Sequence, residues 1–91
     1  MSIAERKMMI SAENQKHIFG QFDAFAKIIE RSLGVTIITR DDEVKIIGDT
    51  ERIMRAEEVL GKLAGSAQRG EEISEQKVNY ILALAVDQQD Y

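Results

Sequence analysis

Gly20 constrains the fold most, because it separates two segments whose apolar residues recur at helical spacing. Ser11 suits a helix N-cap, and the first helix is predicted from Ala12 to Phe19. Gly20 ends it, since glycine alone adopts the left-handed C′ conformation without penalty. A second helix follows and ends at Gly34, and its buried stripe is predicted to comprise Phe25, Ile28, Ile29 and Leu33. The sequence therefore predicts a helix-turn-helix unit.

Strand signals flank this helical unit on both sides. The residues from Val35 to Arg40 are mostly β-branched, Asp41-Asp42 suits a turn, and Glu43 to Gly48 returns with alternating polarity. Together they predict an antiparallel hairpin. Arg6 to Ile10 is short and apolar, and predicts a strand before the first helix.

Two further helices are predicted after the hairpin. Asp49 or Thr50 caps the first, which frays at Gly65, stops by Gly70 and buries Ile53, Ala56, Leu60, Leu63, Ala64 and Ala67. Ser74 caps the second, from Glu75 to Val86, with Val78, Ile81, Leu82 and Ala85 facing inward. A buried strand from Tyr80 to Val86 is the alternative, but the alanine and leucine content favours a helix.

The element order is thus β-α-α-β-β-α followed by a terminal helix. One sheet must bury its apolar face against the helices, which predicts an α+β, two-layer sandwich with an additional C-terminal helix. We expect residues 1–5 to be a disordered start, residues 6–70 to form the domain, and residues 71–91 to hold the last helix and a domain boundary.

Composition limits the classes of function. At 91 residues, 44% hydrophobic and 31% charged, the chain has the make-up of an ordinary globular domain. It has no cysteine, and its lone His17 lacks the neighbours of a zinc site, so we expect no metal. No signal peptide or membrane-spanning apolar run is present, which predicts a cytoplasmic protein with no membrane partner. The net charge of −4 means that any nucleic-acid contact must use a local basic strip.

No set of residues suggests catalysis. Acidic pairs such as Glu57-Glu58 are adjacent in sequence and diverge around a helix, so they form no acid–base dyad. Residues 65–70 have the G-x-x-x-x-G spacing of a phosphate loop, but Glu71-Glu72 follows where Lys-Ser/Thr is required. We therefore expect no catalytic residue and no cofactor within this chain.

The order β-α-α-β-β-α, with a glycine turn between the first two helices, resembles a type I KH domain. In that family a G-x-x-G loop clamps the nucleic-acid backbone beside a groove for about four nucleotides. The resemblance places Gly20-Gln21-Phe22-Asp23 on this loop, with Asp23 at the position of the second glycine. A carboxylate there would repel a phosphate, or would cap the second helix by accepting from the N–H of Phe25 or Ala26.

Other residues are candidates for the same groove. Phe22 either stacks on a base or joins the core stripe three residues before Phe25, and the sequence leaves both open. Basic residues either line one side of the groove or form a solvated face. They are Lys16, Lys27, Arg31, Arg40 and Lys45.

A more specific resemblance is to the N-terminal domain of the PhoH family, and it runs from Met9 to Val86. It is carried by Phe19-Gly20-Gln21-Phe22-Asp23, Ile28-Ile29-Glu30, Leu33-Gly34-Val35, Ile47-Gly48-Asp49, Ala56-Glu57-Glu58-Val59-Leu60 and Gly70-Glu71-Glu72-Ile73. In that family the Gly-Gln-x-Asp form of the turn is usual. The resemblance implies a P-loop ATPase domain after this region, using ATP and Mg, which this chain does not contain.

Two functions follow as expectations. The first is a KH-like module that binds single-stranded RNA for a PhoH-family ATPase acting in RNA metabolism, with that ATPase domain as a partner in cis. The second is a protein-interaction or oligomerisation module of the same ATPase, forming a homo-oligomer and binding no RNA itself.

Overall fold

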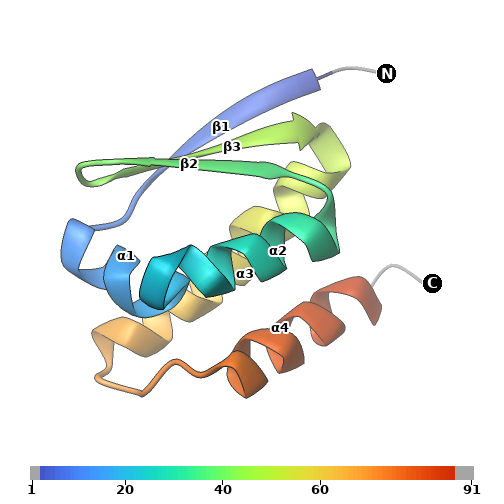
Figure 1. The fold of residues 1–91 in the computed structure, drawn as a ribbon. Coiled ribbons are helices and arrows are strands. Elements are labelled where there is room, and N and C mark those ends of the chain that lie inside the picture. Colours follow the sequence, from blue (N-terminus) through green and yellow to red (C-terminus); the bar gives the residue numbers. More distant parts are fainter. Residues whose placement is uncertain (1–2, 88–91) are drawn as a thin grey trace.

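The computed structural model describes residues 3–87 and has the predicted order of elements (Figure 1). The strands are β1 (Ile3–Met9), β2 (Thr36–Arg40) and β3 (Glu43–Asp49). The helices are α1 (Ala12–Phe19), α2 (Ala24–Leu33), α3 (Thr50–Gln68) and α4 (Glu75–Asp87), and a single 3-10 turn at Gln21–Asp23 joins α1 to α2. The α+β class and the helical, not extended, state of the last segment are confirmed.

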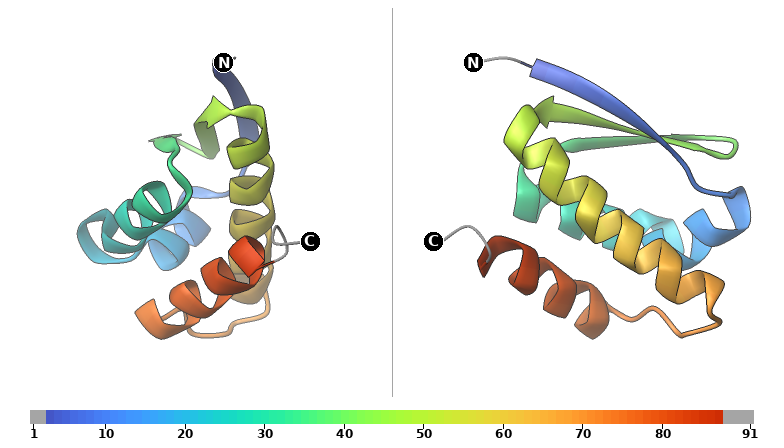
Figure 2. Two further views of the ribbon diagram at one scale, coloured as in Figure 1. Left: turned by 90° about the vertical axis from the view of Figure 1, so that its right-hand side faces the viewer. Right: turned by 180° about the vertical axis from the view of Figure 1, so that it is seen from behind.

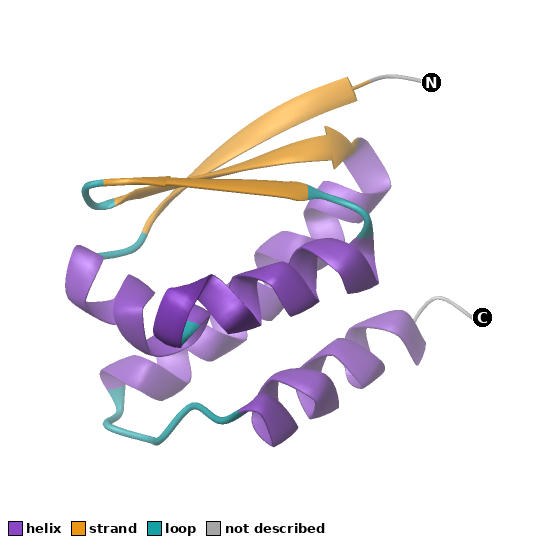
Figure 3. Cartoon of the chain, viewed as in Figure 1, coloured by secondary structure: helices purple, strands orange, loops and turns teal. Residues whose placement is uncertain are grey.

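The three strands form one antiparallel sheet in the order β1-β3-β2, so β3 is central. Helices cover one face of this sheet, and the other face is open (Figure 3). α4 packs against α2 and α3 on the side away from the sheet (Figures 1 and 2). The terminal helix therefore adds a third layer beneath the helices and leaves the open face of the sheet uncovered.

The core lies between the sheet and the helices, and its members largely match the predicted stripes. Val44 and Ile46 of β3 are fully buried, in one apolar cluster with Ile29 of α2 and Leu60 of α3. Each large apolar side chain buried in this way stabilises the fold by roughly 1.5–3 kcal/mol. The four inward positions predicted for α4 are all buried.

Three local predictions are wrong. β1 begins at Ile3, so residues 3–5 belong to the sheet and are not a disordered start, while residues 1–2 lie outside the described part of the chain. Ile10, expected in the strand, follows it and is buried. α3 does not fray at Gly65 but continues to Gln68, because Ser66 and Ala67 are still packed on the core side of the helix.

Polar side chains fix the start of α1. Ser11 caps it by accepting from the N–H of Asn14, as predicted. The buried Gln15 amide donates to the carbonyls of Ile10 and Asp41, at 2.9 and 2.8 Å. An Asp42 carboxylate oxygen also accepts from the N–H of Ala12 at 2.8 Å. These bonds hold the β2–β3 turn against the start of α1.

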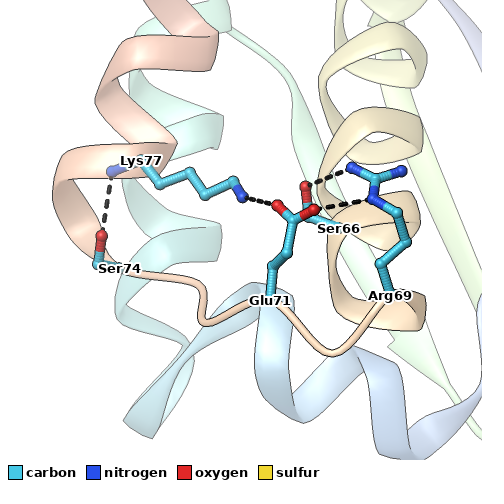
Figure 4. A network of polar contacts seen from close by, with 5 residues as sticks. All are labelled: Ser66, Arg69, Glu71, Ser74 and Lys77. Atoms are coloured by element: carbon cyan, nitrogen blue, oxygen red, sulfur yellow. Dashed lines mark hydrogen bonds and ion pairs between the residues drawn. The ribbon is translucent and has the colours of Figure 1, made fainter.

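The loop between α3 and α4 is closed by a polar network (Figure 4). Glu71 accepts from Arg69 Nε at 2.8 Å and from Lys77 Nζ, and Ser74 Oγ accepts from the backbone N–H of Lys77. The hydrogen bond from Lys77, followed by that from Arg69, lowers the pKa of Glu71 from 4.5 to about 2. The loop thus uses its own charges to join the two helices.

No helix in the described range 3–87 combines the length and the apolar character needed to cross a membrane.

Candidate nucleic-acid interface

Gly20 has a backbone conformation that only glycine adopts readily. Its φ is +74° and its ψ is −177°, which differs from the left-handed helical cap that we expected. Its N–H still closes α1 by donating to the carbonyl of Lys16 at 3.2 Å. A Cβ placed on Gly20 would lie 2.7 Å from Cδ2 of Phe25, so the aromatic ring of α2 packs directly on this glycine. The turn is therefore closed by glycine at its first position.

Two of the next three residues have left-handed backbone. Phe22 has a φ of +56° and Asp23 a φ of +57°, and each such residue costs roughly 1–2 kcal/mol when it carries a side chain. The Phe22 side chain is 87% exposed, which excludes the alternative in which it joins the core stripe. A strained backbone thus holds an aromatic ring in solvent, immediately before α2.

Asp23 occupies the N-cap position of α2 but makes no capping hydrogen bond through its side chain. The alternative in which it accepts from the N–H of Phe25 or Ala26 is therefore excluded, and the reason is its left-handed backbone, because N-caps usually have extended dihedrals. The exposed carboxylate adds a negative charge beside the first turn of α2.

Two of the predicted cations, Lys16 and Lys27, lie about one helical turn from this junction, and Arg31 lies in the last turn of α2. Lys16 lies in the last turn of α1, and Lys27 and Arg31 lie four residues apart on one exposed face of α2. Within the described residues none of the three forms an ion pair. With Asp23 included, the formal charge of this group is positive, although the whole chain is acidic.

Arg40 does not join this group. It lies at the end of β2 opposite Glu43, on the open face of the sheet, because Ile37 and Thr39 alternate with it and face the helices. Lys45 lies on the same open face and pairs with Glu5 at 3.9 Å. The β2–β3 hairpin thus contributes no predicted cation to the helical side.

One contact near these residues was not anticipated. Glu30 of α2 accepts a hydrogen bond from the N–H of Ile37 at 2.7 Å. β2 is an edge strand, so this carboxylate satisfies a backbone donor that the sheet leaves unpaired. No spacing rule connects a helix residue to a strand seven positions later, and we know of no sequence signal that would have found it.

A pocket beside the α3–α4 loop is acidic. It is lined by His17 of α1 and by Gly70, Glu71, Glu72 and Ile73. Two carboxylates at such a pocket disfavour a phosphate, in agreement with the prediction that residues 65–70 are a helix end and not a phosphate loop. The chemistry of the α1–α2 turn is different, since it offers an exposed ring and cations that form no ion pair among residues 3–87, and both suit a flexible anionic strand.

Comparison with known proteins relates the chain to one named protein. Over 83 residues, or 91% of the chain, it is 32% identical to a PhoH-like protein of Bacillus subtilis (strain 168). The match covers 26% of that protein's length, so the chain spans about a quarter of the relative. No family model matches the chain. The chain is thus related to a PhoH-like protein along nearly all of its own length.

Proposed function

We propose that this chain is a KH-like module that binds single-stranded RNA at the α1–α2 turn and the adjoining face of α2. The observation that carries the proposal is Phe22, whose ring is held in solvent by a strained turn in front of α2. Strained backbone is retained where the surrounding structure enforces it, and it gathers at ligand clamps. The β-α-α-β-β-α order and the relation to a PhoH-like protein support the same reading.

Each part of the surface has a separate task. Lys27 and Arg31 attract phosphates along α2, and the N-terminal end of that helix adds a positive dipole. Phe22 stacks on a base, which any base permits, so sequence preference is weak. Asp23 opposes the phosphate and keeps the affinity low. We expect a dissociation constant in the micromolar range or weaker, as for non-specific electrostatic binding.

The similarity to a PhoH-like protein, of which the chain spans about a quarter, also supports the view that this chain is one part of a larger protein. We infer that the chain is the N-terminal, KH-like part of a PhoH-family protein whose P-loop ATPase domain uses ATP and Mg. The RNA held by this module would then be delivered to that domain in cis, for work in RNA metabolism. In this arrangement the chain itself carries no catalytic residue.

The proposal is tested by anisotropy titration of a fluorescein-labelled single-stranded RNA against the chain at several salt concentrations. With three cations engaged, the logarithm of the binding constant should fall with a slope of about −2 against the logarithm of salt. Replacing Lys27 and Arg31 by glutamate should weaken binding at least tenfold, because two attractive charges become repulsive.

The matched control replaces Arg52 and Lys62 of α3 by glutamate, which changes the net charge equally. Both lie in exposed ion pairs, with Asp49 and Glu58, that contribute little to stability. This control should bind RNA nearly as wild type does. Equal weakening by both double variants, or no saturable binding at low salt, would contradict an RNA site at the turn.

The rival function is a protein-interaction or oligomerisation module. The observation that favours it lies elsewhere, at the exposed strand β1, where Ile3 and Met9 are 80% and 79% exposed. The two surfaces lie apart, since α2 packs beside β2 and β1 lies at the opposite edge of the sheet.

A further inference from the structure

Strand β1 is an edge strand with one side of its backbone unused. Among residues 3–87 it pairs with β3 alone, along its whole length of seven residues. Such an edge presents a row of N–H and C=O groups that can pair with another strand. Its side chains on the open face of the sheet are Ile3, Glu5, Lys7 and Met9, because Ala4, Arg6 and Met8 point to the helices.

These four side chains are complementary to the same four side chains of a second, antiparallel copy of β1. If two copies pair antiparallel about Arg6, Ile3 faces Met9 of the other copy and Glu5 faces Lys7. The two-fold axis repeats each pair, so both charges that β1 carries on the open face meet an opposite charge and both of its exposed apolar side chains are covered.

The neighbouring registers lack this complementarity. Opposed residues must lie on the same face of the sheet, so the two-fold axis can pass through Glu5, Arg6 or Lys7 but not between them. An axis through Glu5 opposes two glutamates and sets Ile3 against Lys7. An axis through Lys7 opposes two lysines and sets Glu5 against Met9. Only the register about Arg6 pairs acid with base and apolar with apolar.

Lys7 provides a separate reason to expect a partner. It lies directly opposite Lys45 in the β1–β3 ladder, a like-charge arrangement that destabilises a sheet. Glu5 already contacts Lys45 at 3.9 Å, and Lys7 forms no ion pair with any described residue. Glu5 of a second copy would supply the carboxylate that Lys7 lacks.

The helix beneath β1 leaves space for a second copy. Glu57 of α3 lies 3.8 Å from Arg6 of β1, so the face of α3 that carries Glu57 adjoins this edge. Met54 and Gly61, one turn away on either side, share that face. Met54 is 60% exposed, and a Cβ on Gly61 would meet nothing within 4 Å. A small and an apolar residue there allow two α3 helices to lie side by side.

We propose that the chain forms a two-fold symmetric homodimer through antiparallel pairing of β1 with β1 about Arg6, giving a continuous six-stranded sheet. Two Arg6 and two Glu57 side chains then meet near the axis, where each arginine retains its carboxylate. The α1–α2 turn stays free, because β1 and β2 lie at opposite edges of the sheet. The dimer thus does not depend on the RNA-binding proposal.

The oligomeric state tests this dimer through a charge swap. Sedimentation equilibrium over a range of concentrations should show the mass of the chain rising from 10.3 kDa towards twice that value. Glu5→Lys and Lys7→Glu should each raise the dimer dissociation constant about tenfold or more, since each turns two attractive pairs into repulsive ones. The double variant with both changes restores opposite charges and should recover most of the affinity.

The control is Glu72→Lys, a charge reversal in the α3–α4 loop, which should leave dimerisation unchanged. Circular dichroism establishes that every variant is folded. A wild-type chain that is monomeric at all concentrations would overturn the proposal. So would single variants that dimerise as wild type does, or a double variant that stays as weak as the singles.

Cysteine cross-linking tests the register, and the chain has no native cysteine to interfere. Ile3→Cys and Met9→Cys should form a disulfide when the two variants are mixed, because directly opposed Cβ atoms lie about 4.5–5.5 Å apart. Either variant alone should not, since six residues of strand separate equivalent positions by roughly 20 Å. Cross-linking within each variant alone, without the mixed product, would contradict pairing about Arg6.

Discussion

The chain has two junctions in which a glycine follows one helix and precedes the next, one at Gly20 and one at Gly70. They differ in whether the polar and charged groups after the glycine are paired within the molecule. Both glycines have positive φ, at +74° and +81°. After Gly70 the chain satisfies itself, since Glu71 binds Arg69 and Lys77 and Ser74 caps α4. After Gly20 no side chain caps α2, two residues with side chains adopt left-handed backbone, and the nearby cations are unpaired within the described chain.

This difference indicates which of the two junctions has charged and aromatic groups available to a ligand. A loop whose charges are paired internally has little to offer a ligand, because a ligand must first replace those contacts. The α1–α2 turn is strained and exposes a ring, and its cations form no ion pair in the described part of the chain, so a ligand there has no internal contacts to replace and little ordering to impose. The comparison therefore favours the α1–α2 junction as the binding surface and the α3–α4 junction as a structural connection.

The largest effect on the free energy of unfolding is expected from replacing each of the two glycines by alanine. Gly20→Ala should destabilise the chain by about 2–4 kcal/mol. The new Cβ would clash with the Phe25 ring, and alanine would be strained in the backbone conformation of Gly20. Gly70→Ala should cost only about 1–2 kcal/mol, since its Cβ meets nothing within 4 Å. Urea unfolding monitored by circular dichroism measures both. Equal losses would show that the two junctions are packed alike.

A smaller effect, on binding alone, is expected from removing the exposed ring of the turn. Phe22→Ala should lower RNA affinity about tenfold through lost stacking and leave the free energy of unfolding nearly unchanged, because the ring touches little of the core. Tyr80→Ala is the matched control, as this aromatic is exposed on α4. Anisotropy titration and urea unfolding separate the two effects. A stability loss without an affinity loss would assign Phe22 to packing.

The smallest effect is expected at the α3–α4 network and depends on pH. The folded pKa of Glu71, about 2, lies below its ordinary 4.5, so its pairing stabilises the fold above pH 4.5 and is lost as pH falls towards 2. Glu71→Gln should slightly lower the urea midpoint at pH 7, and the difference from wild type should shrink below pH 4.5. Because Glu71 is exposed, salt should weaken the effect. Glu72→Gln is the control. A difference in urea midpoint between Glu71→Gln and wild type that grows as the pH falls would contradict a stabilising role of the network.

Much of the fold was predictable because local signals agreed. Ser11 and Ser74 cap α1 and α4 as predicted, and the apolar spacing of α3 and α4 identified their buried faces. These features depend on residues a few positions apart, which periodicity and capping rules read directly. Gly20, Lys16 and Lys27 also lie near one turn, because α1 and α2 are adjacent in sequence, whereas Arg31 lies at the far end of α2.

The remainder depends on contacts between distant residues. Arg40 was assigned to the groove, but its side of the sheet follows from the register with β3, which the sequence does not state. Asp23 was given a capping role that its left-handed backbone removes. The Glu30 contact with β2 and the start of β1 at Ile3 likewise require the three-dimensional arrangement.

The most direct test of the central claim is a map of backbone amide shifts by nuclear magnetic resonance as single-stranded RNA is added. We expect the largest shifts from Gly20 to Arg31, with the amides from Gly70 to Ser74 nearly unmoved. Low salt is required, because the proposed contacts are electrostatic. Shifts concentrated in the α3–α4 loop, or absent from the α1–α2 turn, would contradict the account.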